Sequence, residues 1–192
     1  PNILTAKTGI PVVADFRRKD IALGGQGAPF APAFHDFIFN NIDTSISVVN
    51  IGGIANITVL GDRLIGYDTG CGNVLLDMWM AEHQGVPYDE NGEWARTGTV
   101  DYGLLDSMMS DEYFEEPYPK STGREKFNKV WLKSYLAGAT HNPEDVQRTL
   151  VELTALSISN EVLRFNRDMV ILCGGGDKNN FLGERIKVLI PN

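Results

Sequence analysis

The sequence has few cysteines and no long apolar run, and both shortages exclude classes of protein. Its two cysteines, Cys71 and Cys173, lie far apart, each in a glycine-rich stretch. Small secreted domains need a denser set of disulfides, and two cysteines without a nearby pair of histidines make no zinc site. No run approaches the roughly 20 apolar residues of a membrane-spanning helix. We therefore expect a cytoplasmic protein without a disulfide framework.

Positive charge and histidine are also scarce. Lysine and arginine total 17 against 25 aspartates and glutamates, which gives a net charge of −8. This balance disfavours nonspecific binding to nucleic acid or to an anionic membrane, so we expect small-molecule partners. The three histidines, His35, His83 and His141, show no spacing typical of a metal site or a catalytic triad.

The material for a globular core is present. Of the 192 residues, 43% are hydrophobic and 22% are charged, which are ordinary values for a folded domain. The chain starts at Pro1 and stops at Asn192 just after an apolar run, and we expect both ends to be cut from a longer protein. The polar residues 41–45 are the best candidate for a domain boundary.

Alternating apolar residues predict several short strands. Residues 47–51, 55–60 and 63–67 are typical of three strands in a meander, and Gly61-Asp62 predicts a two-residue hairpin between the last two. Two further strands are expected at 10–16 and at 169–173.

Helical periodicity follows this meander. Val74, Met78 and Ala81 predict the buried stripe of the first helix, and Asn142 before Pro143 predicts the start of a long one. The helices are expected at 32–39, 73–84, 101–109, 125–136, 143–165 and 179–188. A meander, a long helix and a strand that enters a glycine run predict an α/β ribonuclease-H-like domain.

A glycine pair joins the first two strands of the meander. Gly52 and Gly53 lie between Asn50 and Asn56. Backbone amides without Cβ atoms let phosphate oxygens approach, and Asn56 can add a side-chain donor. The alternative is a plain hairpin that uses glycine for its positive φ.

A second glycine run, Gly174, Gly175 and Gly176 with Asn179 after it, leads from a strand into a helix. The N-terminus of that helix can hold a phosphate. The run matches neither G-x-G-x-x-G nor G-x-x-x-x-G-K-[ST], which argues against a Rossmann site and a Walker loop. A tight turn packed on the sheet is the alternative.

One carboxylate, Asp68, stands where the third strand is expected to end, next to Gly70 and Gly72. Beside phosphate-binding turns a carboxylate is a poor phosphate ligand but can act as a general base. The alternative is an aspartate that hydrogen-bonds its own turn. Three glycine turns with one acid among them predict a nucleotide site with a base beside it.

Two polar loops complete the candidates. Arg17 between Asp15 and Asp20 could bind a substrate carboxylate with both arms of its guanidinium, and Gln26 before Gly27 could bind sugar hydroxyls. The alternative for this region is a surface ion-pair cluster with a glycine loop. The basic loop 120–125 could meet a phosphate, but a solvated helix start is the preferred interpretation.

Five segments, in order along the chain, carry a family resemblance. They are VVADFRRKDIALGGQGAP (12–29), NIGGIAN (50–56), GYDTGCGN (66–73), KSTGRE with the following FN (120–125 and 127–128) and CGGGDKN (173–179). Together they resemble the signature segments of anhydro-N-acetylmuramic acid kinases, within the superfamily of acetate and sugar kinases, heat-shock proteins and actin. The resemblance implies two actin-type, ribonuclease-H-like domains around an ATP cleft. Residues 1–44 would be the tail of the first domain with its substrate-side loop. Residues 45–192 would be the second domain, with a helical insertion at about 85–144 and its C-terminal end missing.

The resemblance also implies a reaction. A kinase of this family uses ATP with Mg²⁺ to open 1,6-anhydro-N-acetylmuramic acid with water and to phosphorylate O6, in peptidoglycan recycling. Asp68 is implied as the base that activates the water. The implied ATP-binding residues are Asn50, Gly52, Gly53, Asn56, Gly70, Gly72, Gly174, Gly175, Gly176 and Asn179. The implied substrate-side residues are Asp15, Arg17, Asp20, Gln26 and Gly27.

Two departures from the family pattern set further expectations. Cys71 stands where the family usually has proline, which predicts a looser turn after Asp68. The family's N-terminal phosphate loop is not in the chain, so about half of the enzyme is expected here and the isolated piece is expected to be inactive. A related sugar or metabolite kinase and a non-catalytic nucleotide-binding domain are the alternative functions. A homodimer is compatible with all three.

Overall fold

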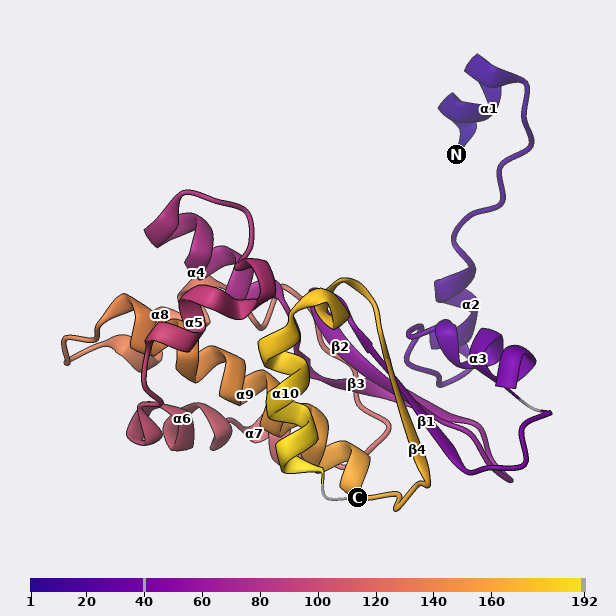
Figure 1. The fold of residues 1–192 in the computed structure, drawn as a ribbon. Coiled ribbons are helices and arrows are strands. Elements are labelled where there is room, and N and C mark those ends of the chain that lie inside the picture. The colour runs from indigo at the N-terminus through magenta and orange to yellow at the C-terminus, as the bar shows by residue number, and fades with distance from the viewer. Residues whose placement is uncertain (40, 191–192) are drawn as a thin grey trace.

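A four-stranded mixed sheet forms the centre of the fold. The computed structural model describes residues 1–39 and 41–190 (Figure 1). The strands β1 (Ile46–Ile51), β2 (Ile54–Val59), β3 (Ile65–Cys71) and β4 (Met169–Cys173) lie in the order β3-β2-β1-β4. β2 is antiparallel to both of its neighbours, whereas β4 is parallel to β1. The predicted α/β class and the ribonuclease-H-like arrangement are therefore confirmed.

Parallel pairing of β4 with β1 requires a long crossover, because the chain must return to the same end of the sheet. The helices between β3 and β4 supply it, and a last helix follows β4 (Figure 1). The helices of the whole chain are α1 (Asn2–Thr8), α2 (Phe16–Ala22), α3 (Ala31–Phe39), α4 (Val74–Gln84), α5 (Glu93–Thr97), α6 (Tyr102–Met109), α7 (Glu112–Glu115), α8 (Lys129–Leu136), α9 (Pro143–Leu163) and α10 (Asn180–Leu189).

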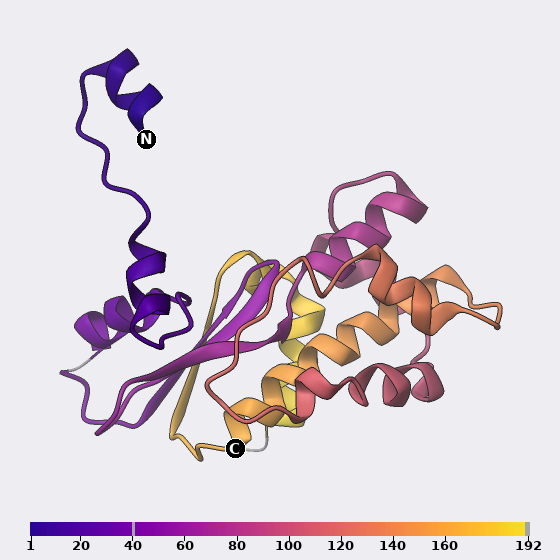
Figure 2. The same ribbon diagram turned by 180° about the vertical axis from the view of Figure 1, so that it is seen from behind.

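The two faces of the sheet bury different partners. In β1, Val49 and Ile51 belong to the core that includes α9, whereas Ile46 and Val48 pack with Phe39 of α3 on the opposite face. This division follows from the period of two along a strand. Figures 1 and 2 show the helices from α4 onward on one side and α3 on the other.

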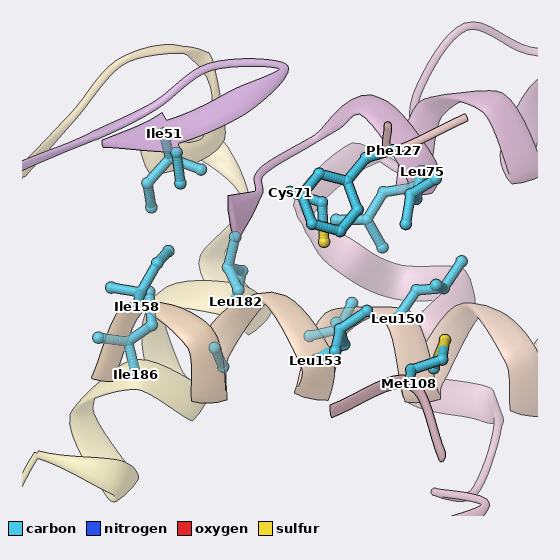
Figure 3. Close-up of a cluster of buried hydrophobic side chains, with 14 of the residues drawn as sticks. Ile51, Cys71, Leu75, Met108, Phe127, Leu150, Leu153, Ile158, Leu182 and Ile186 are labelled. Atoms are coloured by element: carbon cyan, nitrogen blue, oxygen red, sulfur yellow. The ribbon is translucent and has the colours of Figure 1, made fainter. Parts of the chain in front are cut away.

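The main core lies between the sheet and α9. Figure 3 shows Leu150 and Leu153 of α9 beneath Leu75, Phe127 and Cys71. All five side chains are at most 1% exposed. At roughly 1.5–3 kcal/mol for each large apolar side chain removed from water, this cluster is a main source of the stability of the fold.

The N-terminal segment extends away from this body. α1 stands clear of the sheet in both ribbon views (Figures 1 and 2), and every residue from 1 to 26 is exposed. Many of these exposed residues are large and apolar, among them Ile3, Leu4, Val13, Phe16 and Leu23.

Three predicted elements are wrong. Residues 10–15 form no strand, because Pro11 lacks an amide hydrogen and no neighbouring strand offers partners, and Phe16 instead begins α2. β3 extends four residues beyond the predicted end, through Cys71, so Asp68 lies within the strand. The β2–β3 connection spans residues 60–64 and is not a two-residue hairpin.

Other errors concern helices. The predicted buried stripe of α4 is wrong. The helix buries Leu75, Leu76, Trp79 and Met80 and leaves Ala81 exposed, because a different side of the helix packs against the core that includes α9. The segment 85–144 also contains α5 and α7, which are too short to show a helical period. The start of α9 at Pro143 after the N-cap Asn142 and the bounds of β4 are as predicted.

Candidate active site

A row of four side chains crosses the sheet near the carboxyl ends of β1 and β4. The pairing register places Asp68 of β3 opposite Asn56 of β2, Asn56 opposite Asn50 of β1, and Asn50 opposite Cys173 of β4. Directly paired residues share a face, and their strand neighbours belong to the α9 core. The row therefore lies on the face opposite α9. Two predicted phosphate-turn residues and the predicted base are brought together there.

Asp68 is buried and held by a loop. The residue is 6% exposed to solvent. The Ser121 hydroxyl donates to Asp68 Oδ2 at 2.9 Å, and the Thr122 amide donates to the same oxygen at 3.0 Å. Burial raises the pKa of Asp68 above its usual value, while the donors from Thr122 and Ser121 act against that rise. No donor to Oδ1 is present among residues 1–39 and 41–190.

Lys120 contradicts the solvated interpretation of the loop 120–125. It is 3% exposed, and its Nζ lies 3.0 Å from Glu161 Oε1. The Tyr67 hydroxyl donates to Glu161 Oε2 at 2.8 Å. A charge pays a large desolvation penalty unless it is paired, so this lysine anchors the loop in the core and does not meet a phosphate.

The Gly52-Gly53 turn is attached to the N-terminus of α4. The amides of Gly72 and Val74 donate to the Gly53 carbonyl at 2.9 and 3.1 Å, and the Asn73 amide donates to the Gly52 carbonyl at 2.8 Å. A cleft of about 600 Å³ opens beside this turn and is lined by Gly52, Gly53, Asn73, Asp77, Arg124, Gly175 and others. The predicted phosphate turn therefore borders open space.

Arg124 is the cation closest to this turn. A Cβ atom at Gly53 would lie 3.4 Å from its Nη2. Arg124 has no carboxylate within 4.0 Å in the described part of the chain, whereas the nearby Lys129 pairs with Glu82 at 2.8 Å. The charge of Arg124 also acts on Asp77, whose pKa burial raises. The sequence analysis considered a phosphate contact for the loop 120–125, which carries Arg124, but preferred a solvated helix start.

The second glycine run packs against the end of β1. Gly174 has φ +90, and a Cβ atom there would lie 2.7 Å from the Ile51 carbonyl oxygen, while one at Gly176 would clash with the Ile51 side chain. Gly175 and Gly176 also line a neighbouring cleft of about 420 Å³. The run is thus both a tight turn on the sheet and a wall of the cleft. Asn179 lines the same cleft and caps α10 by accepting from the Leu182 amide.

Gly70 and Cys71 are not at the clefts. A Cβ atom at Gly70 would meet Phe114 at 2.9 Å and Ser157 at 3.3 Å, which belong to the helical layer. Cys71 is fully buried within β3, so the expected looser turn after Asp68 is wrong. Gly72 lies against the Gly52 turn, where a Cβ atom would clash with the Gly52 carbonyl oxygen.

The substrate-side candidates hold one another. Arg17 Nε donates to the Gly27 carbonyl at 2.9 Å, and the Gly27 amide donates to Asp20 Oδ2 at 2.7 Å. Asp15 pairs with Arg18 at 3.1 Å on the surface, as in the alternative of a surface ion-pair cluster. Gln26 is exposed. The Arg17 charge acts against the rise in the pKa of Asp68 that burial causes.

Sequence reasoning gave no individual role to Ser121, Thr122, Asn73 or Asp77, although the first three lie in the quoted segments 120–125 and 66–73. Asp77 lies five positions after Gly72 and lines both clefts. The described residues contain no group of three or more His, Cys, Asp and Glu side chains that could hold a metal ion. In the described part of the chain, no helix has the length and apolar character needed to cross a membrane.

The chain resembles known proteins along its whole length. A sequence model of the family described as anhydro-N-acetylmuramic acid kinase matches residues 1–192. A protein of that name from Sulfurovum sp. (strain NBC37-1) is 65% identical over 194 residues, which cover 100% of this chain and 54% of the relative. The protein of that name from Haemophilus influenzae is 50% identical and covers 94% of this chain and 52% of the relative. The chain thus spans about half the length of the curated relatives it matches.

Among the solved structures that match, one is similar at a distance. It is the activator of the 2-hydroxyisocaproyl-CoA dehydratase from Clostridium difficile with bound ADPNP, with a TM-score of 0.48 and 17% identity over 80% of this chain and 54% of that one.

Proposed function

The chain belongs to the anhydro-N-acetylmuramic acid kinase family, and from this premise we propose the activity of the whole protein. It opens 1,6-anhydro-N-acetylmuramic acid with water and phosphorylates O6 from ATP, in the cytoplasm, as a step of peptidoglycan recycling. The products are N-acetylmuramic acid 6-phosphate and ADP. The observation that supports this best is Asp68, a buried carboxylate with one oxygen held by donors, in a polar row beside the Gly52-Gly53 turn.

Asp68 acts as the general base. Water is a poor nucleophile at the anomeric carbon, so a carboxylate that takes one of its protons speeds the attack. The water oxygen bonds to the anomeric carbon, and the bond from that carbon to the bridging oxygen breaks. The freed O6 then attacks the γ-phosphorus of ATP, and ADP leaves. The polar row, which includes Asn56 and Asn50, orients the reactants.

The glycine turns fit a nucleotide. Gly52 and Gly53 present backbone to the larger cleft, and Gly175 and Gly176 line the neighbouring one. Arg124 would neutralise phosphate charge beside Gly53, as arginines commonly do. Mg²⁺ usually enters phosphoryl-transfer sites on the phosphates with one or two carboxylates and waters. Asp77, the carboxylate that lines both clefts, would face such an ion.

We also propose the division into domains. Residues 1–44 are the tail of the first actin-like domain, and the rest belongs to the second, with 85–144 as its helical insertion. The exposed apolar residues of the N-terminal segment support this, because such surface is normally covered. In the full-length protein, hydrogen exchange should protect α1 and α2, whereas the isolated 192-residue chain should leave them unprotected. Light scattering on the same sample measures whether the full-length protein is a homodimer.

The test is a coupled ADP-release assay of the full-length protein with the anhydro sugar against N-acetylglucosamine. Turnover of the anhydro sugar alone is expected. Turnover of N-acetylglucosamine instead would point to a related sugar kinase, and ATP binding without turnover of either would point to a non-catalytic domain.

Asp68→Asn should lower turnover by about 10²–10⁴-fold and leave the Kd for ATP nearly unchanged. The matched control is Asp62→Asn in the exposed β2–β3 connection, which should behave as wild type. Wild-type turnover in Asp68→Asn would refute the assignment of the base.

A further inference from the structure

We propose that Ser121, together with the Thr122 amide, is a positioning residue that holds Asp68 by Oδ2 and thereby assigns Oδ1 as the oxygen that accepts the proton. This inference rests on the proposed function, because it names how the base of that reaction is set. The loop 120–125, for which the sequence favours a solvated helix start, thereby becomes part of the proposed active site.

The contacts on the carboxylate are one-sided. Both donors, the Ser121 hydroxyl at 2.9 Å and the Thr122 amide at 3.0 Å, reach Oδ2. Ser121 and Thr122 are only partly exposed, and Asp68 is buried. An oxygen that accepts two hydrogen bonds has its lone pairs engaged, so the incoming proton goes to the other oxygen.

The loop cannot turn away from the strand, because one backbone hydrogen bond joins the two directly and three further contacts tie them to α7 and α9. The Asp68 amide donates to the Lys120 carbonyl at 3.0 Å, and the Tyr113 hydroxyl donates to the Asp68 carbonyl at 2.6 Å. Lys120 Nζ donates to the Tyr113 carbonyl at 3.0 Å and pairs with the buried Glu161. The backbone on both sides of the Asp68–Ser121 bond is therefore fixed by the core.

The same contacts also decide whether the base is ionised. Burial alone favours the neutral carboxylic acid, which cannot accept the proton of water. Hydrogen bonds to the charged form favour ionisation, and they are stronger when the acceptor is charged. Removing the Ser121 hydroxyl should therefore raise the pKa of Asp68 and leave less of it ionised at a given pH.

The experiment measures the pH dependence of kcat/KM for the anhydro sugar in the full-length protein. In Ser121→Ala, the acid limb should move to higher pH by about one to two units, the size of one hydrogen bond to a charged group. The KM for ATP should stay unchanged. Ser121→Thr keeps the hydroxyl and should restore the wild-type profile. Ser134→Ala, which removes a hydroxyl that donates to the Trp131 carbonyl on α8, is the matched control and should not move the limb.

A second measurement does not depend on turnover. Carbon-13 NMR of aspartate-labelled protein, with Asp68→Asn to assign the signal, follows the Asp68 carboxyl directly. Its titration should move upward in Ser121→Ala. If wild type shows no activity on the anhydro sugar, the proposed function fails, while this titration still decides the role of Ser121.

An unchanged acid limb and an unchanged carboxyl titration in Ser121→Ala would overturn the inference. So would a uniform loss of kcat at every pH without any shift, which a merely structural role would produce. Should Ser121→Ala not fold, Ser121→Cys keeps a donor of weaker strength, and it must show an upward shift of smaller size.

Discussion

Gly72→Ala tests the link between the fold and the proposed nucleotide site. A Cβ atom at residue 72 would clash with the Gly52 carbonyl oxygen and would lie 3.2 Å from the Ala55 amide nitrogen. Both neighbours are backbone atoms, so no side-chain rotation relieves the clash. The N-terminus of α4 and the Gly52-Gly53 turn must therefore move apart.

The expected loss of stability follows from the hydrogen bonds between the N-terminus of α4 and the Gly52-Gly53 turn. Three backbone hydrogen bonds join the two segments, from the amides of Gly72, Asn73 and Val74 to the carbonyls of Gly52 and Gly53, at 2.8–3.1 Å. Each contributes about 0.5–1.5 kcal/mol net. Loss of all three lowers the free energy of unfolding by about 1.5–4.5 kcal/mol, and the displaced turn should weaken ATP binding as well.

The assay is urea unfolding at constant m, together with the Kd for ATP. The control is Gly183→Ala in α10, where a Cβ atom meets nothing within 4 Å. This substitution should raise the free energy of unfolding by about 0.5–1 kcal/mol. A Gly72→Ala protein with wild-type stability and wild-type ATP affinity would refute the argument that this contact holds the site together.

Three further predictions concern buried titratable groups. Lys120→Met should lower the free energy of unfolding in urea by about 1.5–3 kcal/mol, because it removes the charged donor on Oε1 of the buried Glu161 and leaves only Arg164 and the Tyr67 hydroxyl on Oε2; a loss below about 1 kcal/mol would show that the Lys120–Glu161 pair is solvated. Burial lowers the pKa of the His35 imidazole. As the pH falls, the unfolded state therefore binds a proton at this histidine at a higher pH than the folded state does. The free energy of unfolding then decreases as the pH drops below about 6.5. His35→Gln should therefore flatten the pH dependence of the unfolding midpoint between about pH 5 and 7, and an unchanged slope would contradict it. Burial raises the pKa of Cys71 to about 12, so a thiol reagent should modify Cys71 only after denaturation, as mass spectrometry of native and unfolded samples can show.

Elements with strong local signals are predicted well. The start of α9 depends on a proline with an N-cap before it, and β4 is a continuous apolar run that ends at glycine. Both signals lie within a few neighbouring residues. The strand predicted at 10–16 fails for the opposite reason: its apolar residues look the same, but a strand exists only if another strand pairs with it.

The site divides in the same way. The chemistry of the residue types makes five site residues recognisable, because glycine, asparagine and a carboxylate close together around short apolar runs are local features. They are Asn50, Gly52, Gly53, Asn56 and Asp68. Gly70 belongs to the same motif, yet its position faces Phe114 and Ser157 in the helical layer. Adjacent residues of a strand point to opposite faces of the sheet, but this alternation applies only to residues that belong to the strand. Because β3 extends beyond its predicted end through Cys71, the face on which Gly70 lies was not predictable from its motif.

The sequence by itself determined the α/β class, the order of the main strands and helices, the family, and the carboxylate around which the site is built. Only the tertiary structure decided how that carboxylate is held. Ser121 and Thr122 are 53 and 54 positions away from Asp68 along the chain, and the loop that carries them is set by the burial of Lys120 against Glu161. Contacts of this kind depend on packing among distant segments, whereas periodicity and turn chemistry report only on near neighbours.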